Sequence, residues 1–323
     1  MSIKILKNIS LAPYTTWQIG GRAKYFFMAK TINQLKEAMR WAKQHKIKYF
    51  ILGGGSNVLF SDRGFNGLVI KITNYKVQIT NHKSQLKNSP LRAEKFKIIN
   101  VGVGLSLAQL VNWATKNNLT GLEWAAGIPG TVGGAIRGNA GAFGQDIGQA
   151  ISKVTILFPR GLIEQWSAAK CHFAYRDSIF KSNRQLIILG VELKLKKGRQ
   201  ALIKQQMKKF LEQRRSQPQQ PSAGCVFKNP IITSRQRLNL ITQYPDLSNK
   251  ISPKGLIPAA WLIEQCGLKG RQSGQAQISQ RHANFIINLG GAKARDVKKL
   301  IALIKKMVYN KFRIKLQEEI EII

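Results

Sequence analysis

Over the first seventy residues, short apolar runs alternate with polar breaks, a pattern typical of a small α/β domain. The apolar runs predict strands over residues 26–29, 48–52 and 68–72. Thr31 and Gln34 have the spacing of a capping box, so we expect a helix from there to about His45. Residues 53–57 (GGGSN) end the second strand abruptly. These elements predict a first domain over residues 1–72.

The pattern of the next region, residues 73–200, predicts a second domain of α+β character. Apolar runs predict strands over residues 96–101, 153–158, 162–166 and 186–195. The two middle strands flank a Pro-Arg-Gly turn and predict a hairpin. Ser106 has the position of an N-cap for a helix that continues to about Asn117. Residues 81–95 are polar and turn-rich, so they predict no element.

A Pro/Gln-rich stretch, SQPQQPS at residues 216–222, is the clearest boundary in the chain and follows a basic helix expected over 198–216. Beyond it, the pattern predicts helices over 259–266 and 294–311 and a final strand over 314–323. These elements predict a third domain, counted from the basic helix, over residues 201–323. The fold class we expect is therefore α+β.

A glycine-rich stretch, residues 121–144, stands apart from these patterns because it is also apolar. Glycine recurs at 127, 130, 133, 134, 138, 141 and 144. Glycine weakens helices and strands, so we expect neither here. Backbone free of Cβ atoms can point its N–H groups at a bound anion, which favours a ligand cradle over a buried, turn-rich core segment. Residues 53–59 (GGGSNVL) are a second candidate phosphate loop, although they match neither GxGxxG nor the P-loop pattern.

Bulk composition excludes several classes of protein. The 323 residues are 44% hydrophobic, which argues against disorder. We find no apolar run near the length of about 20 residues that a membrane span needs, and no signal peptide. The three cysteines are widely spaced and indicate neither a disulfide framework nor a metal site. We therefore expect a cytoplasmic protein with no metal and no membrane partner.

The net charge of +37, from 52 Lys and Arg against 15 Asp and Glu, raises the possibility of nucleic-acid binding. The basic residues are spread along the whole chain and form no arm, and no aromatic–basic motif accompanies them. We interpret them as a solvated surface. Nonspecific binding of polyanions is expected through the long-range field, without a specific nucleic-acid partner.

Six motifs in one order resemble a known family. They are LGGGSNVL, AGIPGTVGGAIRGNAGAFG, YRDSIFK, SAGCVFKNP, HANFIIN and the LQEEI ending, and together they extend over nearly the whole chain. The chain resembles UDP-N-acetylenolpyruvoylglucosamine reductase, of the short type that carries SAG(S/C)VFKNP. The resemblance implies a two-part FAD-binding fold of the vanillyl-alcohol-oxidase type and a separate α/β substrate-binding domain, whose C-terminal strand returns to the active site. It also implies FAD and NADPH as cofactors, a UDP-sugar enolpyruvyl ether as substrate and UDP-N-acetylmuramate as product, and a monomer is expected.

The resemblance implies three catalytic residues for hydride and proton addition to an enolpyruvyl double bond. Cys225 stands where the family has its proton donor, and a free thiol, with an ordinary pKa of about 8.5, is mostly protonated at neutral pH. Arg176 matches the arginine that would stabilise a developing enolate. Glu319 matches the C-terminal glutamate, but the usual L-E-P-E reads Leu-Gln-Glu-Glu here, so Glu318 is a rival. The alternative to each role is structural: a small buried cysteine, an ion pair with Asp177, or an exposed edge strand.

The resemblance also implies binding residues. For the cofactor these are Tyr14, Leu52, Gly53, Gly54, Gly55, Ser56, Asn57, Gly127, Pro129, Gly130, Thr131, Gly133, Gly134, Ala135, Asn139 and Gly141. For the substrate they are Tyr175, Lys228, Asn229, His282 and Asn284. Thr15 and Trp17 are expected to border the flavin, whereas Gln18 stands where the family more often has arginine. His282 could equally be a structural histidine, and Lys228 one more surface lysine.

Residues 231–258 are longer than the connection expected after KNP and suggest an insertion, either a loop or a lid. Two other functions stay open at this stage. One is a related flavin oxidase of a sugar or lactone. The other is a basic nucleic-acid-binding protein on a relic flavin fold.

Overall fold

A computed structural model describes residues 3–73, 77–80 and 96–323. The polar stretch 81–95 lies outside the described residues. The chain forms two compact units. Unit 1 comprises residues 1–9, 23–54 and 66–215, and unit 2 comprises residues 10–22, 55–65 and 216–323. The division into three domains at 72 and 200 stays a prediction, since these units group the chain differently.

The first sheet belongs mainly to unit 1 and has the strand order β1-β2-β5-β3. Its strands are β1 (Leu6–Ser10), β2 (Arg22–Ala29), β3 (Tyr49–Leu52) and β5 (Phe65–Ile72), with β3 parallel to β5. Helix α1 (Ile32–Gln44) begins where expected, because the Thr31 side chain accepts a hydrogen bond from Gln34 N at 3.2 Å. Its buried residues Leu35, Ala38 and Ala42 lie on one face, which packs into the core of unit 1.

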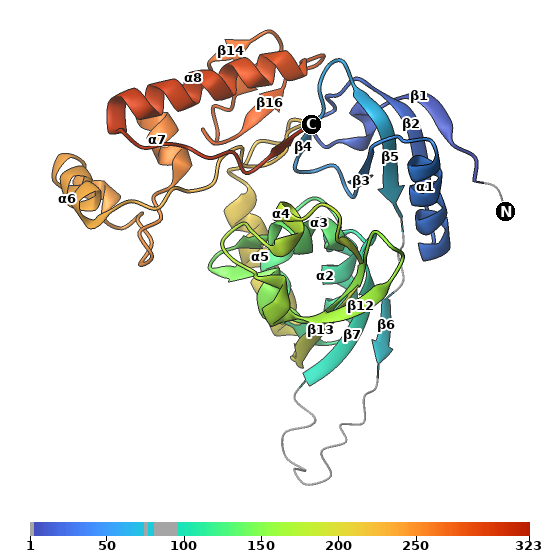
Figure 1. Ribbon diagram of the computed structural model, residues 1–323. Coiled ribbons are helices and arrows are strands. Elements are labelled where there is room, and N and C mark those ends of the chain that lie inside the picture. The colour runs from blue at the N-terminus through green and yellow to red at the C-terminus, as the bar shows by residue number, and fades with distance from the viewer. Residues whose placement is uncertain (1–2, 74–76, 81–95) are drawn as a thin grey trace. The chain divides into compact units, whose positions relative to one another are not determined.

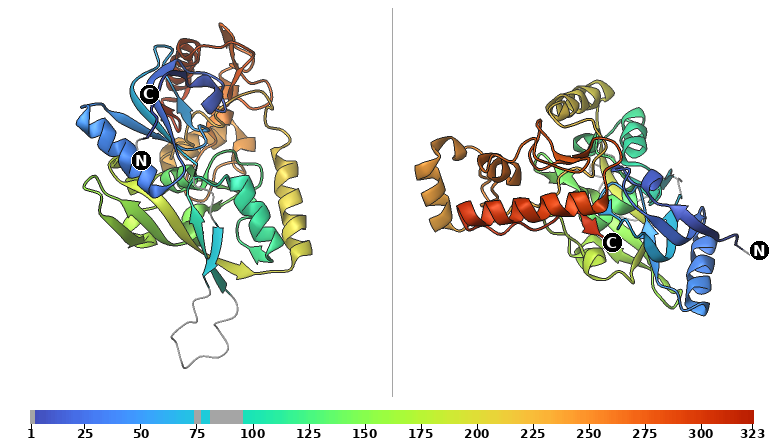
Figure 2. Two further views of the ribbon diagram at one scale, coloured as in Figure 1. Left: turned by 90° about the vertical axis from the view of Figure 1, so that its right-hand side faces the viewer. Right: turned by 90° about the horizontal axis from the view of Figure 1, so that it is seen from above.

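The second sheet of unit 1 is antiparallel, with the order β12-β11-β13-β7-β6 and β8 paired to β13. Its strands are β6 (Val77–Thr80), β7 (Phe96–Gly102), β8 (Leu119–Thr120), β11 (Ile151–Leu157), β12 (Ile163–Ser167) and β13 (Ile187–Lys197). The hairpin expected after the glycine-rich stretch is β11–β12. Helix α2 (Leu107–Lys116) has a complete capping box from Ser106 and Gln109. Helix α5 (Gln200–Arg214) runs alongside α2 (Figure 2).

The glycine-rich stretch contains a helix, α3 (Val132–Gly138), so the expectation of neither helix nor strand was wrong. Thr131 caps this helix by accepting from Gly134 N at 3.4 Å, and Val132, Ala135 and Ile136 are buried in the core. Each glycine costs a helix about 0.5–1 kcal/mol relative to alanine. Burial of the three apolar side chains offsets that cost. Short strands β9 (Gly141–Ala142) and β10 (Gln145–Asp146) follow, and a four-residue helix, α4 (Ile179–Ser182), comes later.

Unit 2 is built on a small sheet of order β14-β15-β16 that is covered by helix α8 (Ala294–Phe312), as Figure 1 shows. The strands are β14 (Gln272–Ser273), β15 (Ala276–Ile278) and β16 (Ile286–Asn288), and α7 (Ala259–Gln265) packs on α8. The large buried apolar residues of α8 are spaced as one helix face, and they are Val297, Leu300, Ile301, Ile304 and Val308. Asp62 caps α8 from elsewhere in unit 2, accepting hydrogen bonds from Ala294 N at 2.7 Å and Arg295 N at 3.0 Å.

The C-terminal strand is shorter than the expected run over residues 314–323. Only β17 (Glu321–Ile322) is a strand, and it pairs parallel with β4 (Val58–Leu59). Before it, Glu318 forms an isolated antiparallel bridge with Phe227. The segment thus changes partners within a few residues, and neither pairing is long enough to form a continuous ladder.

Residues 231–258 contain helix α6 (Ser234–Gln243), which begins with a capping box from Thr233 and Gln236. Leu240, Leu247 and Ile251 are buried in the core of unit 2, so this segment is anchored rather than loose. Across the described parts of the chain, none of the helices combines the length and the apolar character that a bilayer crossing requires.

Candidate active site

The two predicted glycine loops meet inside unit 1. A Cβ on Gly54 would come within 2.7 Å of Gly130 Cα, and one on Gly53 would come within 2.6 Å of Thr131 Oγ1. Both distances are shorter than carbon atoms tolerate, so glycine is required at both positions. The sequence therefore identified two segments that contact each other through their backbones.

The backbone of this junction suits an anion. Within the described ranges, no acceptor is hydrogen-bonded to the N–H groups of Gly53, Gly54 or Gly130. Lys71 on β5 donates from Nζ to Gly53 O at 2.8 Å, which adds a positive charge beside the loop. Burial lowers the pKa of Lys71. Half-buried N–H groups beside a lysine are the donor set that a diphosphate takes in anion-binding loops, so these residues fit the phosphates of FAD.

Other predicted cofactor residues have clear packing roles. A Cβ on Gly133 would come within 2.9 Å of Val103 Cβ, and one on Gly141 within 2.8 Å of Asp146 Cβ. Gly127 has a φ of 78°, in the left-handed region. Beside it, Arg214 Nη2 on α5 donates to Trp124 O at 3.1 Å and holds the start of the loop. These contacts favour glycine at the three positions whether or not a ligand binds beside them.

Asn139 links the glycine-rich stretch to the turn that carries Arg176. Its Nδ2 donates to Ala174 O at 2.8 Å, and its Oδ1 accepts from Gly148 N at 3.1 Å. The turn is closed by reciprocal backbone hydrogen bonds between Ala174 and Asp177. Asn139 is 4% exposed, so these bonds are shielded from water.

Arg176 is half-buried at the tip of this turn with a φ of 54°. Lys181 Nζ donates to Arg176 O at 2.9 Å, and the Arg176 guanidinium lies 5.6 Å from the centre of the Tyr175 ring. Asp177 Oδ1 accepts from Ser178 N at 2.9 Å. A left-handed arginine fixed by this many bonds is a strained conformation of the kind found at functional sites. Arg176 and Tyr175 belong to unit 1.

Cys225 belongs to unit 2, in an extended segment that pairs on both sides. On one side Cys225 bridges Phe285. On the other side, Glu319 N donates to Val226 O at 2.8 Å, and Lys228 N donates to Gln317 O at 2.9 Å. Cys225, Lys228 and Glu319 thus lie on two adjacent segments of backbone.

The two glutamates have different surroundings. Glu318 is 2.9 Å from Lys305 Nζ on α8. Glu319 is fixed through its backbone, because its carbonyl also accepts from Asn57 Nδ2 at 3.0 Å. Glu319 lies in a bend of the backbone, directly after the isolated bridge of Glu318.

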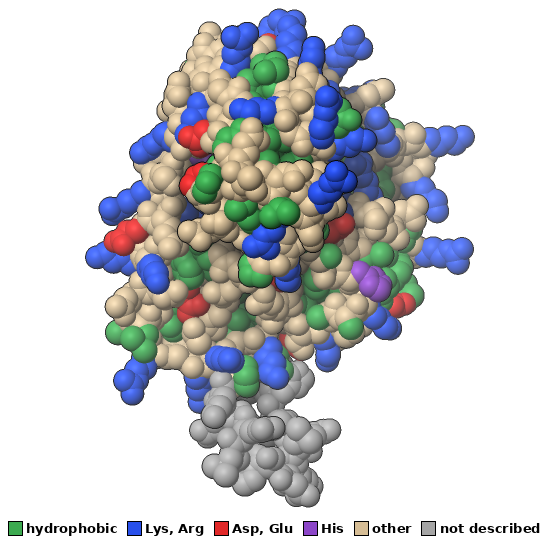
Figure 3. Space-filling view, turned by 90° about the vertical axis from the view of Figure 1, so that its left-hand side faces the viewer, with side chains coloured by type: hydrophobic (Ala, Val, Ile, Leu, Met, Phe, Trp, Pro, Cys, Tyr) green, Lys and Arg blue, Asp and Glu red, His purple; other side chains and the backbone are tan. Residues whose placement is uncertain are grey.

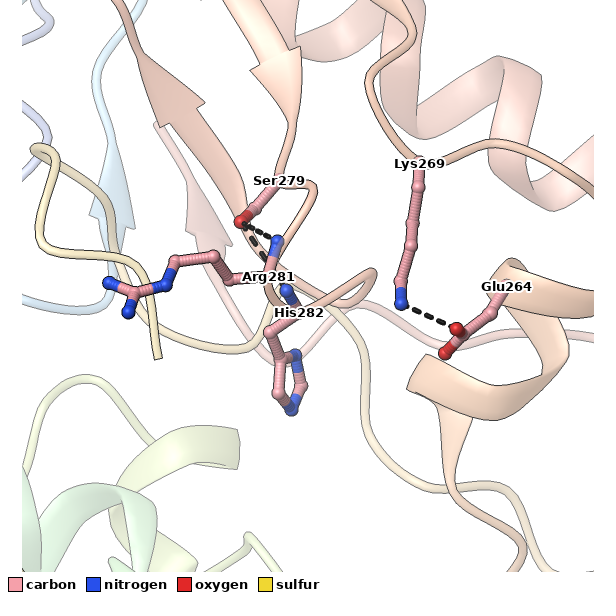
Figure 4. A network of polar contacts seen from close by, with 5 residues as sticks. All are labelled: Glu264, Lys269, Ser279, Arg281 and His282. Atoms are coloured by element: carbon pink, nitrogen blue, oxygen red, sulfur yellow. Dashed lines mark hydrogen bonds and ion pairs between the residues drawn. The ribbon is translucent and has the colours of Figure 1, made fainter. Parts of the chain in front are cut away.

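His282 follows Ser279, whose Oγ accepts from the backbone N–H groups of Arg281 at 3.1 Å and His282 at 3.4 Å (Figure 4). Its Nδ1 is buried and, among the described residues, has no hydrogen-bond partner. Burial lowers the pKa of the ring, and the nearby Lys269 lowers it further while Glu264 opposes the shift. Lys269 and Glu264 form an ion pair with each other. A neutral ring with an unused buried nitrogen suits hydrogen bonding to a polar ligand.

Asn284 and Asn229 make structural hydrogen bonds. The Asn284 amide bonds both backbone groups of Phe227, and Asn229 Oδ1 accepts from Ala259 N at 3.0 Å, at the start of α7.

Of the remaining predicted cofactor residues, Leu52 and Pro129 belong to unit 1, whereas Tyr14, Gly55, Ser56 and Asn57 belong to unit 2. Thr16 N donates to Gly55 O at 3.1 Å, and Thr16 Oγ1 donates to Ser222 O at 2.7 Å. Trp17 is fully buried, and its Nε1 donates to Ile286 O at 2.7 Å. The indole of Trp17 therefore serves the core of unit 2.

Sequence reasoning missed Lys71 and Arg214. Each is one of 52 basic residues, and no local pattern distinguishes a lysine or arginine that bonds a loop carbonyl from one on the surface. A search of the described residues finds no cluster of three His, Cys, Asp or Glu side chains that could hold a metal ion.

Two family models match the chain. One is described as the UDP-N-acetylenolpyruvoylglucosamine reductase C-terminal domain and matches residues 217–323. The other is described as an FAD binding domain and matches residues 23–167. The fold class expected from the sequence, an α+β FAD-binding fold followed by a separate C-terminal domain, is confirmed.

Relatives named UDP-N-acetylenolpyruvoylglucosamine reductase match over nearly the full length. That from Bacillus licheniformis is 37% identical over 322 residues, which cover 99% of this chain and 94% of the relative. That from Bacillus subtilis is 36% identical over 322 residues, with the same two coverages. The crystal structure of UDP-N-acetylenolpyruvylglucosamine reductase from Thermus caldophilus has a TM-score of 0.72 and 30% identity, covering 99% of this chain and 98% of that one.

Proposed function

Because the chain belongs to the UDP-N-acetylenolpyruvoylglucosamine reductase family, we propose that it reduces UDP-N-acetylglucosamine enolpyruvate to UDP-N-acetylmuramate in peptidoglycan precursor synthesis. FAD is the cofactor and NADPH the reductant. The observation that carries this proposal is the pairing of the Cys225–Lys228 backbone with the segment that bears Glu319. It brings a thiol, a lysine and a carboxylate from distant parts of the sequence to adjacent backbones.

Bound FAD supplies a hydride acceptor and donor. In this proposal the N–H groups of Gly53, Gly54 and Gly130 would hold the phosphates of FAD, and Lys71 would contribute positive charge.

Cys225 supplies the proton. Hydride addition to one carbon of the enolpyruvyl double bond leaves enolate-like charge on the other, next to the carboxylate. The S–H bond of Cys225 breaks as its proton forms the new C–H bond, and water later reprotonates the thiolate. Lys228, three residues on, stabilises that thiolate or binds the substrate.

Two further groups manage the charge of the enolate. The Arg176 guanidinium forks onto the substrate carboxylate and stays charged throughout. Glu319, rather than Glu318, is the acid beside that carboxylate, since the Glu318 carboxylate is held by Lys305. Tyr175, Asn229 and His282 complete the substrate contacts.

The physiological setting follows from the chemistry. FAD, NADPH and the UDP-sugar are all anions, which a strongly basic protein attracts through its long-range field. Nucleotide-linked precursors and NADPH are cytoplasmic, so we place the enzyme there, as a monomer.

Replacement of Cys225 tests the proposal. In Cys225→Ala, NADPH should still bleach the flavin absorbance, but reoxidation by the enolpyruvyl nucleotide should slow by about 10²–10⁴-fold, the usual contribution of a general acid. Cys225→Ser should retain substantial activity. Cys266→Ser is the matched control, because Cys266 is also half-buried in unit 2 and should not affect either half-reaction.

The proton-donor role is wrong if Cys225→Ala reoxidises as fast as the parent. A flavin that air reoxidises rapidly, with no response to the enolpyruvyl nucleotide, would instead identify an oxidase of a sugar or lactone. The same half-reaction with NADH in place of NADPH tests the choice of reductant.

A further inference from the structure

Asn284 makes three hydrogen bonds to the two residues that follow Cys225. Its backbone carbonyl accepts from Val226 N at 2.8 Å. Its side-chain Oδ1 accepts from Phe227 N at 2.9 Å, and its Nδ2 donates to Phe227 O at 2.8 Å. Asn284 is 2% exposed and Phe227 is 1% exposed, so water cannot take over these bonds.

The chemistry of this contact is specific to a primary amide. One acceptor and one donor side by side are what a neighbouring strand presents to a peptide group, and only the side chains of Asn and Gln carry both at every pH. Cys225 pairs with the backbone of Phe285 as in a β-sheet. Beyond this bridge, the Asn284 side chain takes the place of a neighbouring strand and bonds the backbone of Phe227.

The opposite edge of the same segment is also fully bonded. Glu319 N donates to Val226 O and Lys228 N donates to Gln317 O. The backbone that carries Cys225 and Lys228 therefore cannot move without breaking hydrogen bonds on one of its two edges. On one edge, two of these hydrogen bonds come from the Asn284 side chain.

We propose that Asn284 is a positioning residue, whose amide fixes the Cys225–Lys228 backbone, and that it does not contact the substrate. The catalytic part of this inference rests on the proposed function of Cys225. The thiol measurement below does not, because it reports the local structure whether or not the protein turns over.

The decisive variant is Asn284→Asp, read against pH. A protonated carboxyl group has one acceptor and one O–H donor and reproduces both bonds, whereas a carboxylate offers acceptors only and would repel Phe227 O. Burial favours the neutral form, so the change should occur above the ordinary Asp pKa of about 3.9. The local structure should thus be restored in acid and lost toward neutral pH.

The first readout is the rate at which iodoacetamide alkylates Cys225, resolved by peptide mass spectrometry and expressed as the ratio of variant to wild type at each pH. For Asn284→Asp this ratio should be near one in acid and rise to at least about fivefold at neutral pH, as the segment opens. The rate at Cys266, in the same unit, should stay unchanged and so exclude global unfolding.

Asn288→Asp is the matched control. Asn288 is 5% exposed, donates to Trp17 O at 3.0 Å and accepts from Gly290 N and Ala292 N. The Asn288→Asp variant carries the same substitution nearby, and the Asn288 side chain does not bond the Cys225–Lys228 backbone. The ratio of its Cys225 alkylation rate to that of wild type should therefore be near one at every pH. Asn284→Ser keeps one hydroxyl that does not ionise, and should raise the ratio by a smaller factor with no dependence on pH.

The second readout separates positioning from substrate binding. At neutral pH, Asn284→Asp should lower kcat for reoxidation by the enolpyruvyl nucleotide about tenfold with little change in KM, and recover in acid. Flavin reduction by NADPH should stay within about twofold of wild type.

Two results overturn the inference: a Cys225 ratio of one at all pH values, or a raised KM at unchanged kcat, which marks a substrate contact. If Cys225 alkylation behaves as expected but the wild type is not reoxidised by the enolpyruvyl nucleotide, the positioning role stands and the proposed function fails.

Discussion

At the scale of single residues, the adjacent glutamates Glu318 and Glu319 show what the structure adds to the motif. The C-terminal motif reads Leu-Gln-Glu-Glu in place of L-E-P-E, so the sequence left Glu318 and Glu319 as candidates for the catalytic acid. Lys305, on α8, bonds the Glu318 carboxylate, and this ion pair supports the proposal of Glu319 as the acid. Glu319 N donates a backbone hydrogen bond to Val226 O, next to Cys225. The choice of Glu319 depends on a partner thirteen residues away, which no local pattern shows.

His282 gives a prediction about pH and stability. Burial lowers its pKa below the ordinary 6.5, so the folded protein resists protonation of this ring. As the pH falls through about 6.5, the unfolded chain takes up a proton that the folded chain does not, and folding free energy is lost. His282→Gln should remove this loss, so its Tm should decline less than that of wild type between about pH 7.5 and pH 5.5. Thermal denaturation with saturating FAD measures it.

The control for His282 is His172→Gln, at an exposed ring in unit 1, which should leave the decline of Tm with pH as in wild type. Equal declines in wild type and His282→Gln would mean that His282 is not buried as described.

At the scale of elements, signals carried within one element were predicted well. Helices α1 and α2 begin at their capping residues, and α7 and α8 end within a residue or so of the expected positions. These elements follow from periodicity and caps, which the sequence contains in full.

Elements that depend on distant partners were missed. Strand β1 is half-exposed and polar, so its pairing with β2 leaves no apolar run to detect. Helix α3 forms despite its glycine content because three of its side chains are buried against the core. The pairing of β17 with β4 joins residues more than 260 positions apart, and no periodicity encodes a partner. For the site, both glycine loops were predicted from the sequence as ligand loops, whereas the contributions of Lys71 and Arg214 were not.

The junction of the glycine loops gives a prediction at this scale. Gly54→Ala would place a methyl group 2.7 Å from Gly130 Cα, which must push the two loops apart. The FAD content of the purified protein, read as flavin absorbance per protein, should fall at least about tenfold, since loss of a few phosphate bonds costs more than 1.4 kcal/mol.

Gly138→Ala is the matched substitution in α3, where nothing lies within 4 Å of the added Cβ. It should retain FAD and stabilise the protein by about 0.5 kcal/mol through helix propensity. Normal flavin content in Gly54→Ala would rule out the cradle formed by these two loops.

At the scale of the whole molecule, charge is the dominant property. The formal net charge is +37, and Figure 3 shows Lys and Arg side chains scattered over the face that it draws, with few acidic ones between them. A dispersed positive surface is expected to attract polyanions through their phosphate or sulfate charge and not through base edges.

We therefore expect binding to duplex DNA or heparin that depends on salt and not on sequence. The affinity for a random duplex should fall at least about tenfold between 50 and 200 mM salt, as phosphate contacts release counterions. Duplexes of unrelated sequence should bind alike in a fluorescence anisotropy titration. Sequence-selective binding that persists at about 0.5 M salt would point to a nucleic-acid function instead.

The composition of unit 2 from three separate stretches of chain has a consequence for biogenesis. Hydrogen-bond partners in this unit are far apart in the sequence. The separation is 206 residues for Thr16 and Ser222, 262 for Asn57 and Glu319, and 269 for Trp17 and Ile286. At a translation rate of about 5–20 residues per second, the delay between the synthesis of two such partners is on the order of 10–50 s. During that delay, the indole of Trp17 has no hydrogen bond to Ile286. Unit 2 can therefore complete these contacts only after residues 286 to 319 have been synthesised.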